Sequence, residues 1–364
     1  MRLISNKRES FTHGLQIGKR RGVPGFAERS DTQTSVAWDP EGIYKDTVPQ
    51  KGGYFSSVKP VETVDEELDP VFLKQNPIKP LKGKLTNTMK LKKILLDRYM
   101  PVNLDLPNVQ LLHLDPPIFL VENFWSKAKC KELIEELRAT GRMAQSTVGA
   151  GNLYSSSVKD SNRRTSSSVL IDNQLQEEFP RIGSFAEEIQ QNAFEILQGN
   201  RLGQWGRSGK QPLFQQYCFE ALQAAEYQQG QHFLEHEDAF PVSVAEENKF
   251  QRHATVLLYL NDVEQGGETT FSHLNISVKP RGGSALIFFP SFSDGTPDHR
   301  TLHIATDAED VKWVTQQWIS RGFNSRLASQ KQLAEEGKVD AVLSRRKAKG
   351  AKKKAKGSGK GFSM

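Results

Sequence analysis

The second half of the chain consists of short, closely spaced runs of β-prone residues, and this pattern constrains the fold most strongly. Beyond residue 213 the runs are separated by Gly, Pro, Asn and Asp, which favour turns. They read FEALQAAEY, HATVLLYLND, NISVKP, GGSALIFFP and KWVTQQWIS. Many short strands of this kind bury their apolar faces by forming two facing sheets or a closed barrel. The sequence therefore predicts an antiparallel sandwich or jelly roll.

Two amphipathic helices are predicted before these strands. In KAKCKELIEELRAT the apolar residues recur at i, i+3, i+4 and i+7, and Ser126 stands where an N-cap is expected. These apolar positions are Cys130, Leu133, Ile134 and Leu137. A second helical pattern over about 183–198 uses Phe185, Ile189, Ala193 and Ile196. The predicted fold class is α+β, mainly β: a jelly roll with supporting N-terminal helices.

The two ends of the chain differ in composition from this middle part. Residues 1–108 mix Gly, Pro, Ser and Lys without sustained periodicity, which predicts a poorly ordered extension. The folded domain is expected over 109–324, and 325–364 are predicted as a short helical piece followed by a basic tail. The first thirty residues contain no apolar run, so no secretory signal is visible and the compartment stays open. The longest apolar stretch, 109–121, contains charged residues and prolines and is not expected to span a membrane.

The basic net charge belongs to the C-terminal tail. The chain of 364 residues has 49 Lys+Arg and 43 Asp+Glu, a net charge of +6. Nine of the basic residues and no acidic ones lie in 345–360, so the rest of the chain has 40 basic and 43 acidic residues. This tail is either a solvated extension or a contact for nucleic acid or another acidic surface. Nucleic-acid binding is therefore expected only through residues 345–360.

Cysteine usage excludes two classes of protein. The chain has two cysteines, Cys130 and Cys218, too few for a disulfide scaffold or a multi-cysteine zinc module. They could form at most one bridge, and the sequence leaves open whether they do.

The spacing His236-Glu237-Asp238 is the first sign of a metal site. In a strand, residues i and i+2 point to the same face, so the imidazole and the carboxylate can bind one metal. Two histidines and one carboxylate with open positions opposite are typical of non-haem Fe(II) oxygenases. A three-residue pattern is weak by itself, because it occurs by chance on solvated surfaces. A zinc-protease helix is rejected, because Phe233 stands where that motif needs its glutamate.

The third metal ligand is not fixed by spacing alone. His253, His273, His299 and His303 are all candidates. Lys312 follows shortly after His303 and could hold the far carboxylate of a dicarboxylate cosubstrate as a charge-assisted pair. The alternative role for Lys312 is an ordinary lysine at a strand end, with its stem lying across a tryptophan.

A long series of motifs in register resembles the catalytic domain of prolyl 4-hydroxylases, within the 2-oxoglutarate- and Fe(II)-dependent dioxygenases. The resemblance covers roughly residues 115–322. Its motifs are Tyr227-x-x-Gly230-x-x-Phe233-x-x-His236-x-Asp238, Arg252-x-x-Thr255-x-x-x-Tyr259-Leu260-Asn261-Asp262, Gly266-Gly267-Glu268-Thr269-x-Phe271, Lys279-Pro280-x-Gly282, Asp298 before His303, and Lys312-Trp313 with Trp318-Ile319. Upstream, PPIFLVENF, Cys130 and Arg164-Thr165-Ser166 fit the same family.

This resemblance implies a double-stranded β-helix, with 109–324 as the dioxygenase catalytic domain. It implies that iron is bound by His236, Asp238 and His303. It further implies that 2-oxoglutarate is bound by Lys312, Tyr227 and Thr269, and that Arg252 lies near the peptide substrate. The implied reaction converts 2-oxoglutarate and O₂ to succinate and CO₂ while hydroxylating proline in a peptide or protein. Ascorbate is expected to keep the Fe(II) reduced.

The chain also departs from the family pattern. Phe233 stands where tyrosine is usual, and the Pro and Gly common between His303 and Lys312 are absent, with one residue fewer between these positions. Two other functions are kept as alternatives. One is a different dioxygenase of the superfamily, such as a nucleic-acid demethylase or a non-proline hydroxylase, and the other is a non-catalytic iron-binding interaction module.

Overall fold

The computed structural model describes residues 67–82, 88–146 and 163–324, all of which belong to one compact unit within Pro40–Met364. The predicted tail at 325–364 and the first 66 residues lie outside the described residues. The helices are α1 (Pro70–Gln75), α2 (Thr88–Arg98), α3 (Lys127–Thr140), α4 (Asn173–Glu178), α5 (Pro180–Ile196) and α6 (Val242–Asn248), with the short 3₁₀ turns η2 (Gly199–Arg201), η3 (Ser272–Leu274) and η4 (His299–Thr301). None of the described helices has the length and hydropathy needed to cross a membrane.

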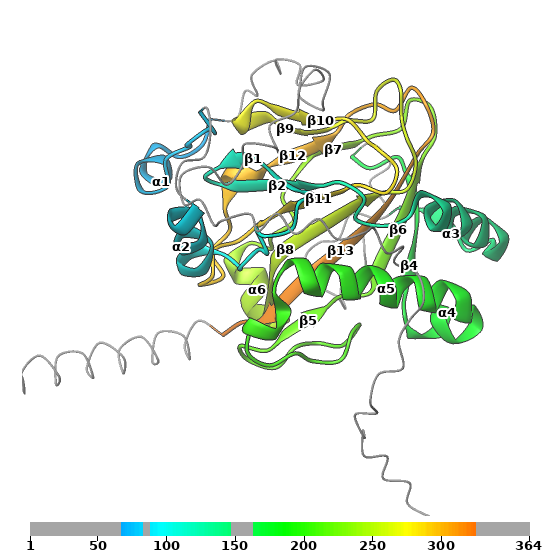
Figure 1. Cartoon of the computed structure of the whole chain (residues 1–364), viewed down its shortest axis with the longest axis horizontal. Helices are drawn as coiled ribbons and strands as arrows, with labels where there is room; N and C mark the ends of the chain where they lie inside the picture. Colours follow the sequence, from blue (N-terminus) through cyan, green and yellow to red (C-terminus); the bar gives the residue numbers. More distant parts are fainter. Residues whose placement is uncertain (1–66, 83–87, 147–162, 325–364) are drawn as a thin grey trace, which may run out of the picture. The chain divides into compact units, whose positions relative to one another are not determined.

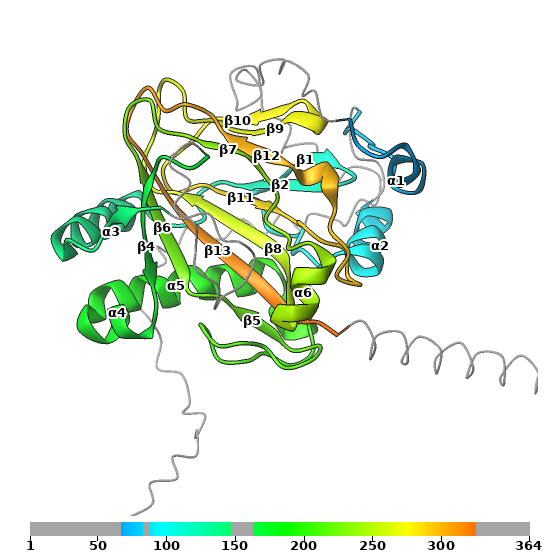
Figure 2. The same ribbon diagram turned by 180° about the vertical axis from the view of Figure 1, so that it is seen from behind.

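The strands form a large sheet and a small sheet (Figures 1 and 2). The strands are β1 (Val109–Leu114), β2 (Pro117–Val121), β3 (Ala144–Gln145), β4 (Ser167–Ile171), β5 (Tyr217–Phe219), β6 (Leu222–Tyr227), β7 (Phe233–His236), β8 (Phe250–Tyr259), β9 (Thr269–Phe271), β10 (Ile276–Val278), β11 (Ala285–Phe288), β12 (His303–Ala305) and β13 (Lys312–Gly322). The large sheet has the order β1-β2-β11-β8-β13-β6-β4-β3, and β5 also pairs with β13. The small sheet has the order β10-β9-β12-β7. These pairs are antiparallel, and the architecture is the double-stranded β-helix expected from the sequence.

Residues of the large sheet alternate between two apolar cores, as the period of a strand requires. In β8 and β11 one set packs among the helices, and it comprises Ala254, Val256, Leu258, Ala285 and Ile287. The other set faces the small sheet and comprises Leu257, Tyr259, Leu286 and Phe288. Both views show α5 and the small sheet on opposite sides of the large sheet (Figures 1 and 2). The inner core is therefore the space between the two sheets, and the candidate site lies there.

The two predicted helices are present, with apolar faces close to those expected. In α3, Cys130, Leu133 and Leu137 are fully buried, whereas Ile134 is only partly buried. Ser126 is the N-cap residue, but its side chain makes no capping hydrogen bond. Both cysteines are buried and free, which answers the question of pairing that the sequence left open.

Residues 67–108 differ from the expectation of a poorly ordered extension wherever the structure describes them. Helix α2 buries Leu91 and Leu95, and the turn after it buries Tyr99 and Met100, all in the core that the helices share with the large sheet. Leu91, the partly buried Ile94 and Leu95 recur at i, i+3 and i+4 and form a short amphipathic face, which the expectation of a poorly ordered extension overlooked. The packed body therefore includes described residues N-terminal to the expected boundary.

Candidate active site

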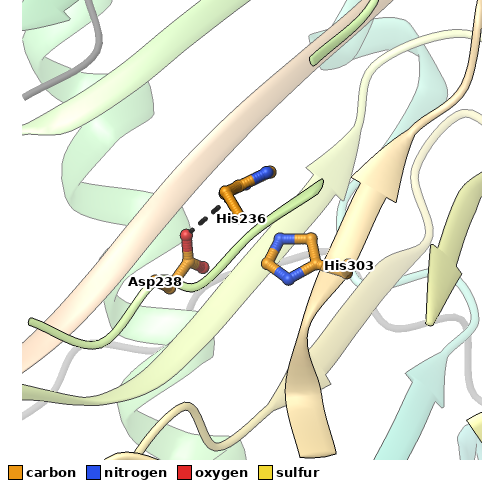
Figure 3. Close-up of side chains that lie close together, drawn as sticks. All are labelled: His236, Asp238 and His303. Carbon is orange, nitrogen blue, oxygen red and sulfur yellow. Dashed lines mark ion pairs between the residues drawn. The ribbon is translucent and has the colours of Figure 1, made fainter. Parts of the chain in front are cut away.

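The three predicted metal ligands come together at the end of the small sheet. Strands β7 and β12 pair so that His303 lies directly opposite His236. Strand β7 ends at His236, and Asp238 lies in the bend that follows (Figure 3). One ligand atom from each of His236, Asp238 and His303 lies within 4.8 Å of the others. Among the described residues, this is the one cluster of three or more His, Cys, Asp or Glu side chains with ligand spacing.

Backbone hydrogen bonds fix the tautomer of both histidines. The Nδ1 atom of His236 lies 2.8 Å from the carbonyl oxygen of Leu234, and that of His303 lies 3.0 Å from the carbonyl oxygen of Thr301. Because a carbonyl only accepts, each Nδ1 carries the proton and each Nε2 keeps its lone pair. The Nε2 of His236 is buried and has no hydrogen-bond partner within the described part of the chain. This is the arrangement that metal-binding histidines adopt, so the donor set fits a divalent metal.

The charges of the cluster also suit metal binding. Burial and the neighbouring His303 hold the pKa of His236 well below its usual value, so this imidazole is neutral at pH 7. Burial alone would raise the pKa of Asp238, but the adjacent histidines, the Arg252 guanidinium and the Thr255 hydroxyl lower it. A metal would therefore meet an ionised carboxylate and an imidazole that needs no deprotonation.

Aromatic rings surround the two histidines. The Phe233 ring stacks on His236, with centroids 3.5 Å apart and planes at 13°. The rings of Phe271 and Phe288 lie 5.5 Å and 4.8 Å from that of His303. Phe233, which replaces the usual tyrosine, is thus a face-to-face support for one imidazole. These apolar contacts lower the local dielectric and keep water from one side of the cluster.

The predicted cosubstrate residues form a second group in the inner core. Lys312 pairs with Tyr227 across β13 and β6, and its Nζ lies 5.1 Å from the Tyr227 ring centroid. This ammonium group is 2% exposed and donates to the carbonyl oxygen of Gly267 at 2.7 Å. Burial lowers the pKa of Lys312 to about 7. Burial removes water from around this ammonium group, so a bound carboxylate can take the place of that water as its partner.

Two consecutive glycines form a turn beside Lys312 with positive φ. Gly266 and Gly267 have φ of 68° and 69°. A Cβ on Gly266 would lie 2.3 Å from the carbonyl oxygen of Asp307, and one on Gly267 would lie 3.2 Å from the Cδ of Lys312. Both positions therefore require glycine, because the turn lies close to the backbone at Asp307 and to the Lys312 side chain.

Comparison with known proteins identifies the family. Residues 222–320 match the family model described as the 2OG-Fe(II) oxygenase superfamily. The chain is 30% identical over 233 residues to "Probable prolyl 4-hydroxylase 3" of Arabidopsis thaliana, covering 58% of this chain and 72% of the relative. It is also 30% identical over 244 residues to "Probable prolyl 4-hydroxylase 6" of the same plant, covering 62% and 76%. The chain belongs to the prolyl 4-hydroxylase family.

A solved structure in the comparison is the collagen prolyl hydroxylase of Paramecium Bursaria Chlorella virus-1 with 2-oxoglutarate. It has 24% sequence identity and a TM-score of 0.42, and the match covers 56% of this chain and 96% of the viral one. As a member of the 2OG-Fe(II) oxygenase superfamily, the protein is an Fe(II)- and 2-oxoglutarate-dependent dioxygenase that uses O₂.

The other candidate histidines lie apart from this cluster. His253 is fully buried near Tyr217, with ring centroids 6.1 Å apart, and burial lowers its pKa to about 3. His299 is half exposed, and its Nδ1 lies 2.6 Å from Glu237 Oε1. His273 lies in η3. In this prolyl 4-hydroxylase family member, His303 is therefore the histidine that joins His236 and Asp238.

Arg252 lies beside the metal cluster, and its guanidinium is held by contacts with Glu220 and Trp318. Its Nε and Nη2 both donate to the Glu220 carboxylate at 2.9 Å, and its guanidinium stacks 3.8 Å from the Trp318 ring centroid. Its Nη1 donates to the carbonyl oxygen of Asp238 at 3.4 Å. The guanidinium thus has one face on an aromatic ring and one edge on a carboxylate, which fixes its position.

Two residues with clear contacts were not assigned roles from the sequence. The Thr255 hydroxyl donates to Asp238 Oδ2 at 2.6 Å. The Tyr259 hydroxyl donates to Thr269 Oγ1 at 2.9 Å. Their spacing of four places both on the inner face of β8, a signal already present in the quoted motif Arg252-x-x-Thr255-x-x-x-Tyr259. Thr255 thus orients the carboxylate of the metal cluster, and Tyr259 orients Thr269.

We expect Thr255→Val to weaken Fe(II) binding by roughly 10–100-fold, because the Asp238 carboxylate loses the hydroxyl that orients it. Anaerobic titration of the metal-free protein with Fe(II) measures this effect. Thr270→Val is a matched control, since Thr270 is equally buried and its hydroxyl bonds to Ser277 at 2.8 Å instead. Equal Fe(II) affinities for the two variants would contradict a role for Thr255 in the metal centre.

Proposed function

We propose that this dioxygenase hydroxylates proline residues within a peptide or protein and releases succinate and CO₂. The observation that carries the proposal is the pairing of a His-Asp-His cluster with a buried lysine in the same inner core. In this proposal His236, Asp238 and His303 bind Fe(II). Lys312 binds the far carboxylate of 2-oxoglutarate. Membership of the prolyl 4-hydroxylase family supports proline as the target.

The protein's own residues bind and orient the reactants rather than react covalently. The bound iron supplies the activation of O₂ and 2-oxoglutarate, which amino-acid side chains cannot provide. Lys312 supplies the positive charge that fixes one end of the cosubstrate, and Tyr227 forms the wall beside that ammonium group. Thr269, held by Tyr259, offers its hydroxyl from β9 of the small sheet. Phe233, stacked on His236, limits water at the metal end.

Arg252 is the proposed contact for the peptide substrate. Its guanidinium is fixed between Glu220 and Trp318 and reaches the Asp238 backbone. Because it is immobilised before substrate arrives, little side-chain entropy is lost on binding. Its side chain is 17% exposed, which leaves part of the group accessible from outside.

Ascorbate is the proposed reductant that restores Fe(II) after occasional oxidation of the metal. We expect time courses without ascorbate to start at the same rate and then decline. Adding ascorbate should restore the initial rate if iron oxidation causes the decline. The same decline in the presence of ascorbate would contradict this role.

The direct test of the function is mass spectrometry of proline-rich peptides incubated with the protein, Fe(II), 2-oxoglutarate and ascorbate. The expected product carries one added oxygen atom on proline, with equal release of succinate. A methylated oligonucleotide serves as the comparison substrate. Demethylation of the oligonucleotide with no change in any peptide would overturn the proposal.

Binding of 2-oxoglutarate should take up a proton above neutral pH. The pKa of Lys312 is lowered to about 7, so the amine is mostly uncharged at pH 8, and a bound carboxylate favours the charged form. Uptake at pH 8 should approach roughly one proton per 2-oxoglutarate, and affinity should fall up to about tenfold per pH unit above 7. Below about pH 6 the lysine is already charged, so affinity there should be independent of pH.

Calorimetry in buffers of different ionisation enthalpy measures this uptake on protein loaded with Fe(II) under argon. Loading the metal first separates the lysine from protons displaced at the histidines. Lys312→Met is the control, and it should bind 2-oxoglutarate weakly with no buffer dependence. Absence of proton uptake in the unmodified protein would show that Lys312 does not bind the cosubstrate.

A further inference from the structure

The side chain of Asn261 is bonded to the main chain on both sides of Lys312. Its Oδ1 accepts from the backbone N–H of Trp313 at 2.7 Å, and its Nδ2 donates to the carbonyl oxygen of Val311 at 2.8 Å. The Nδ2 also donates to the carbonyl oxygen of Asp262 at 3.0 Å. Because an amide oxygen only accepts and an amide nitrogen only donates, these three bonds fix the orientation of the carboxamide. One side chain thus holds both peptide groups that flank the lysine.

The strand register explains why a side chain makes these bonds. Strand β8 ends at Tyr259, which pairs with Val314 of β13. Two residues further along, Lys312 lies opposite Asn261, where β8 has already ended. On its other side, Lys312 pairs with Tyr227 of β6. The Asn261 carboxamide therefore takes the place of the missing backbone partner at the first residue of β13.

The backbone of Asn261 is held in turn by the segment before β11. A Cβ on Gly282 would lie 3.2 Å from the Cα of Asn261, so the lack of a side chain at Gly282 allows this close approach. The adjacent Asp262 accepts from the Gly282 N–H at 3.0 Å and forms an ion pair with Lys127. The carboxamide is therefore attached to a backbone that other contacts already fix.

The position of the Lys312 ammonium group depends on both ends of a long side chain. At the far end, its Nζ donates to the carbonyl oxygen of Gly267 at 2.7 Å. At the near end, the Cα lies between the two peptide groups that Asn261 holds. The connection from His303 to Lys312 contains no proline to restrict its backbone. Since a charge-assisted hydrogen bond is short and directional, a displacement of about 1 Å at the near end would weaken carboxylate binding.

We propose that Asn261 is a positioning residue for the cosubstrate, because its carboxamide holds the backbone that carries Lys312. This inference rests on the proposed function, in which Lys312 binds the far carboxylate of 2-oxoglutarate. Asn261 acts through the lysine, so its effect on cosubstrate binding should disappear when the ammonium group is removed.

A double-mutant cycle on 2-oxoglutarate binding tests the proposal. Asn261→Leu keeps the branched shape of the side chain and removes both hydrogen-bonding groups. Calorimetry on protein loaded with Fe(II) under argon should show the Kd for 2-oxoglutarate raised by roughly 10–100-fold. In the Lys312→Met background, the same substitution should change the Kd by no more than about twofold. Fe(II) affinity should be equal in all four proteins.

Hydrogen exchange of the metal-free protein gives a second readout, which needs no cosubstrate. The Trp313 N–H loses its acceptor in Asn261→Leu and should lose protection against exchange. If Asn261→Leu does not fold, Asn261→Asp replaces it. That variant keeps the acceptor for Trp313 but cannot donate to Val311, so its Kd for 2-oxoglutarate should also rise.

Asn192→Leu is the matched control. Asn192 is a partly buried residue of α5, and its Nδ2 donates to the carbonyl oxygen of Phe124 at 2.8 Å. This variant also removes a carboxamide that bonds the main chain, but at a place away from β13. It should keep both the Kd for 2-oxoglutarate and the protection of Trp313, whatever thermal stability it loses.

The outcomes separate this inference from the proposed function. If Lys312→Met keeps the Kd of the unmodified protein, Lys312 does not bind the cosubstrate and the proposed site is wrong. If Lys312→Met weakens binding but Asn261→Leu does not, the inference alone is wrong. An equal loss from Asn261→Leu with and without the lysine would show that Asn261 acts independently of Lys312, which would also overturn the inference. None of these measurements requires peptide turnover, so a failure to oxidise proline is read separately.

Discussion

Asp238→Ala should abolish Fe(II) binding and succinate release, the largest effect that we expect from any single substitution. The Asp238 carboxylate is the only anionic donor in the cluster, and the lowered pKa keeps it ionised. Removing it leaves two imidazoles to hold a divalent cation. The loss should exceed the roughly 10–100-fold that follows from removing a partner that only orients a ligand. Anaerobic Fe(II) titration and succinate release measure the two losses.

Glu237→Ala is the matched control for this substitution. Glu237 is the adjacent carboxylate, but its Oε1 lies 2.6 Å from His299 Nδ1. It is not one of the three residues of the metal cluster. Fe(II) affinity should therefore be unchanged in this variant. Thermal unfolding of the metal-free proteins checks that both variants fold. Full activity of Asp238→Ala, or equal losses in the two variants, would rule out the proposed metal centre.

The sequence was most informative where one local pattern encodes both structure and chemistry. The β-prone runs predicted the strands because β-branched and aromatic residues bounded by turn-forming residues favour extended backbone. His236 and Asp238 were found together because their spacing is local. His303 and Lys312 follow long connections, and spacing alone could not choose His303 among four histidines. The resemblance to the family identified it, and the register of β12 against β7 explains why it reaches the cluster.

Features that depend on distant contacts could not be predicted in this way. Helix α2 has only a short apolar face, formed by Leu91, Ile94 and Leu95, and the core that this face packs against is formed by segments that follow it in the chain. Arg252 was expected near the peptide, but its pairing with Glu220 arises only when β8 and the turn after β5 meet. The role of Thr255 likewise depends on its hydrogen bond to Asp238, which lies seventeen residues earlier in the chain.

A buried charge network joins the N-terminal helices to the segment that carries His303. The Arg300 guanidinium is fully buried and donates to both oxygens of Asp298, at 2.7 and 2.8 Å. It also donates to Asp115 at 3.0 Å and to the carbonyl oxygens of Asn76 and Pro77 after α1. Asp115 and Asp298 are each 1% exposed. Arg300 therefore neutralises carboxylates that water does not reach.

Arg300→Met should lower the free energy of unfolding by about 3–5 kcal/mol, because it leaves a buried carboxylate without its cation. Asp115 would keep its ion pairs with Arg98 and Lys79, whereas Asp298 would keep the Tyr99 hydroxyl and the backbone N–H of residue 300 but no cation. Urea unfolding at pH 7 measures the change. Fe(II) affinity should fall as well, because Thr301, the next residue, supplies the carbonyl that orients His303.

Two further variants separate this mechanism from a general loss of packing. Arg281→Met removes an ion pair with Glu264 whose members are 37% and 68% exposed, and it should cost at most about 1 kcal/mol. The double variant Asp298→Asn with Arg300→Met removes the stranded charge, so it should regain part of the stability lost in Arg300→Met. If the double variant is less stable than Arg300→Met, or if Arg300→Met costs no more than Arg281→Met, the buried charge is not what stabilises this junction. The prediction thus tests whether the buried ion pairs of Arg300 stabilise the packing of α1 and α2 against the segment that leads to His303. The sequence alone predicted a poorly ordered extension for the residues of both helices.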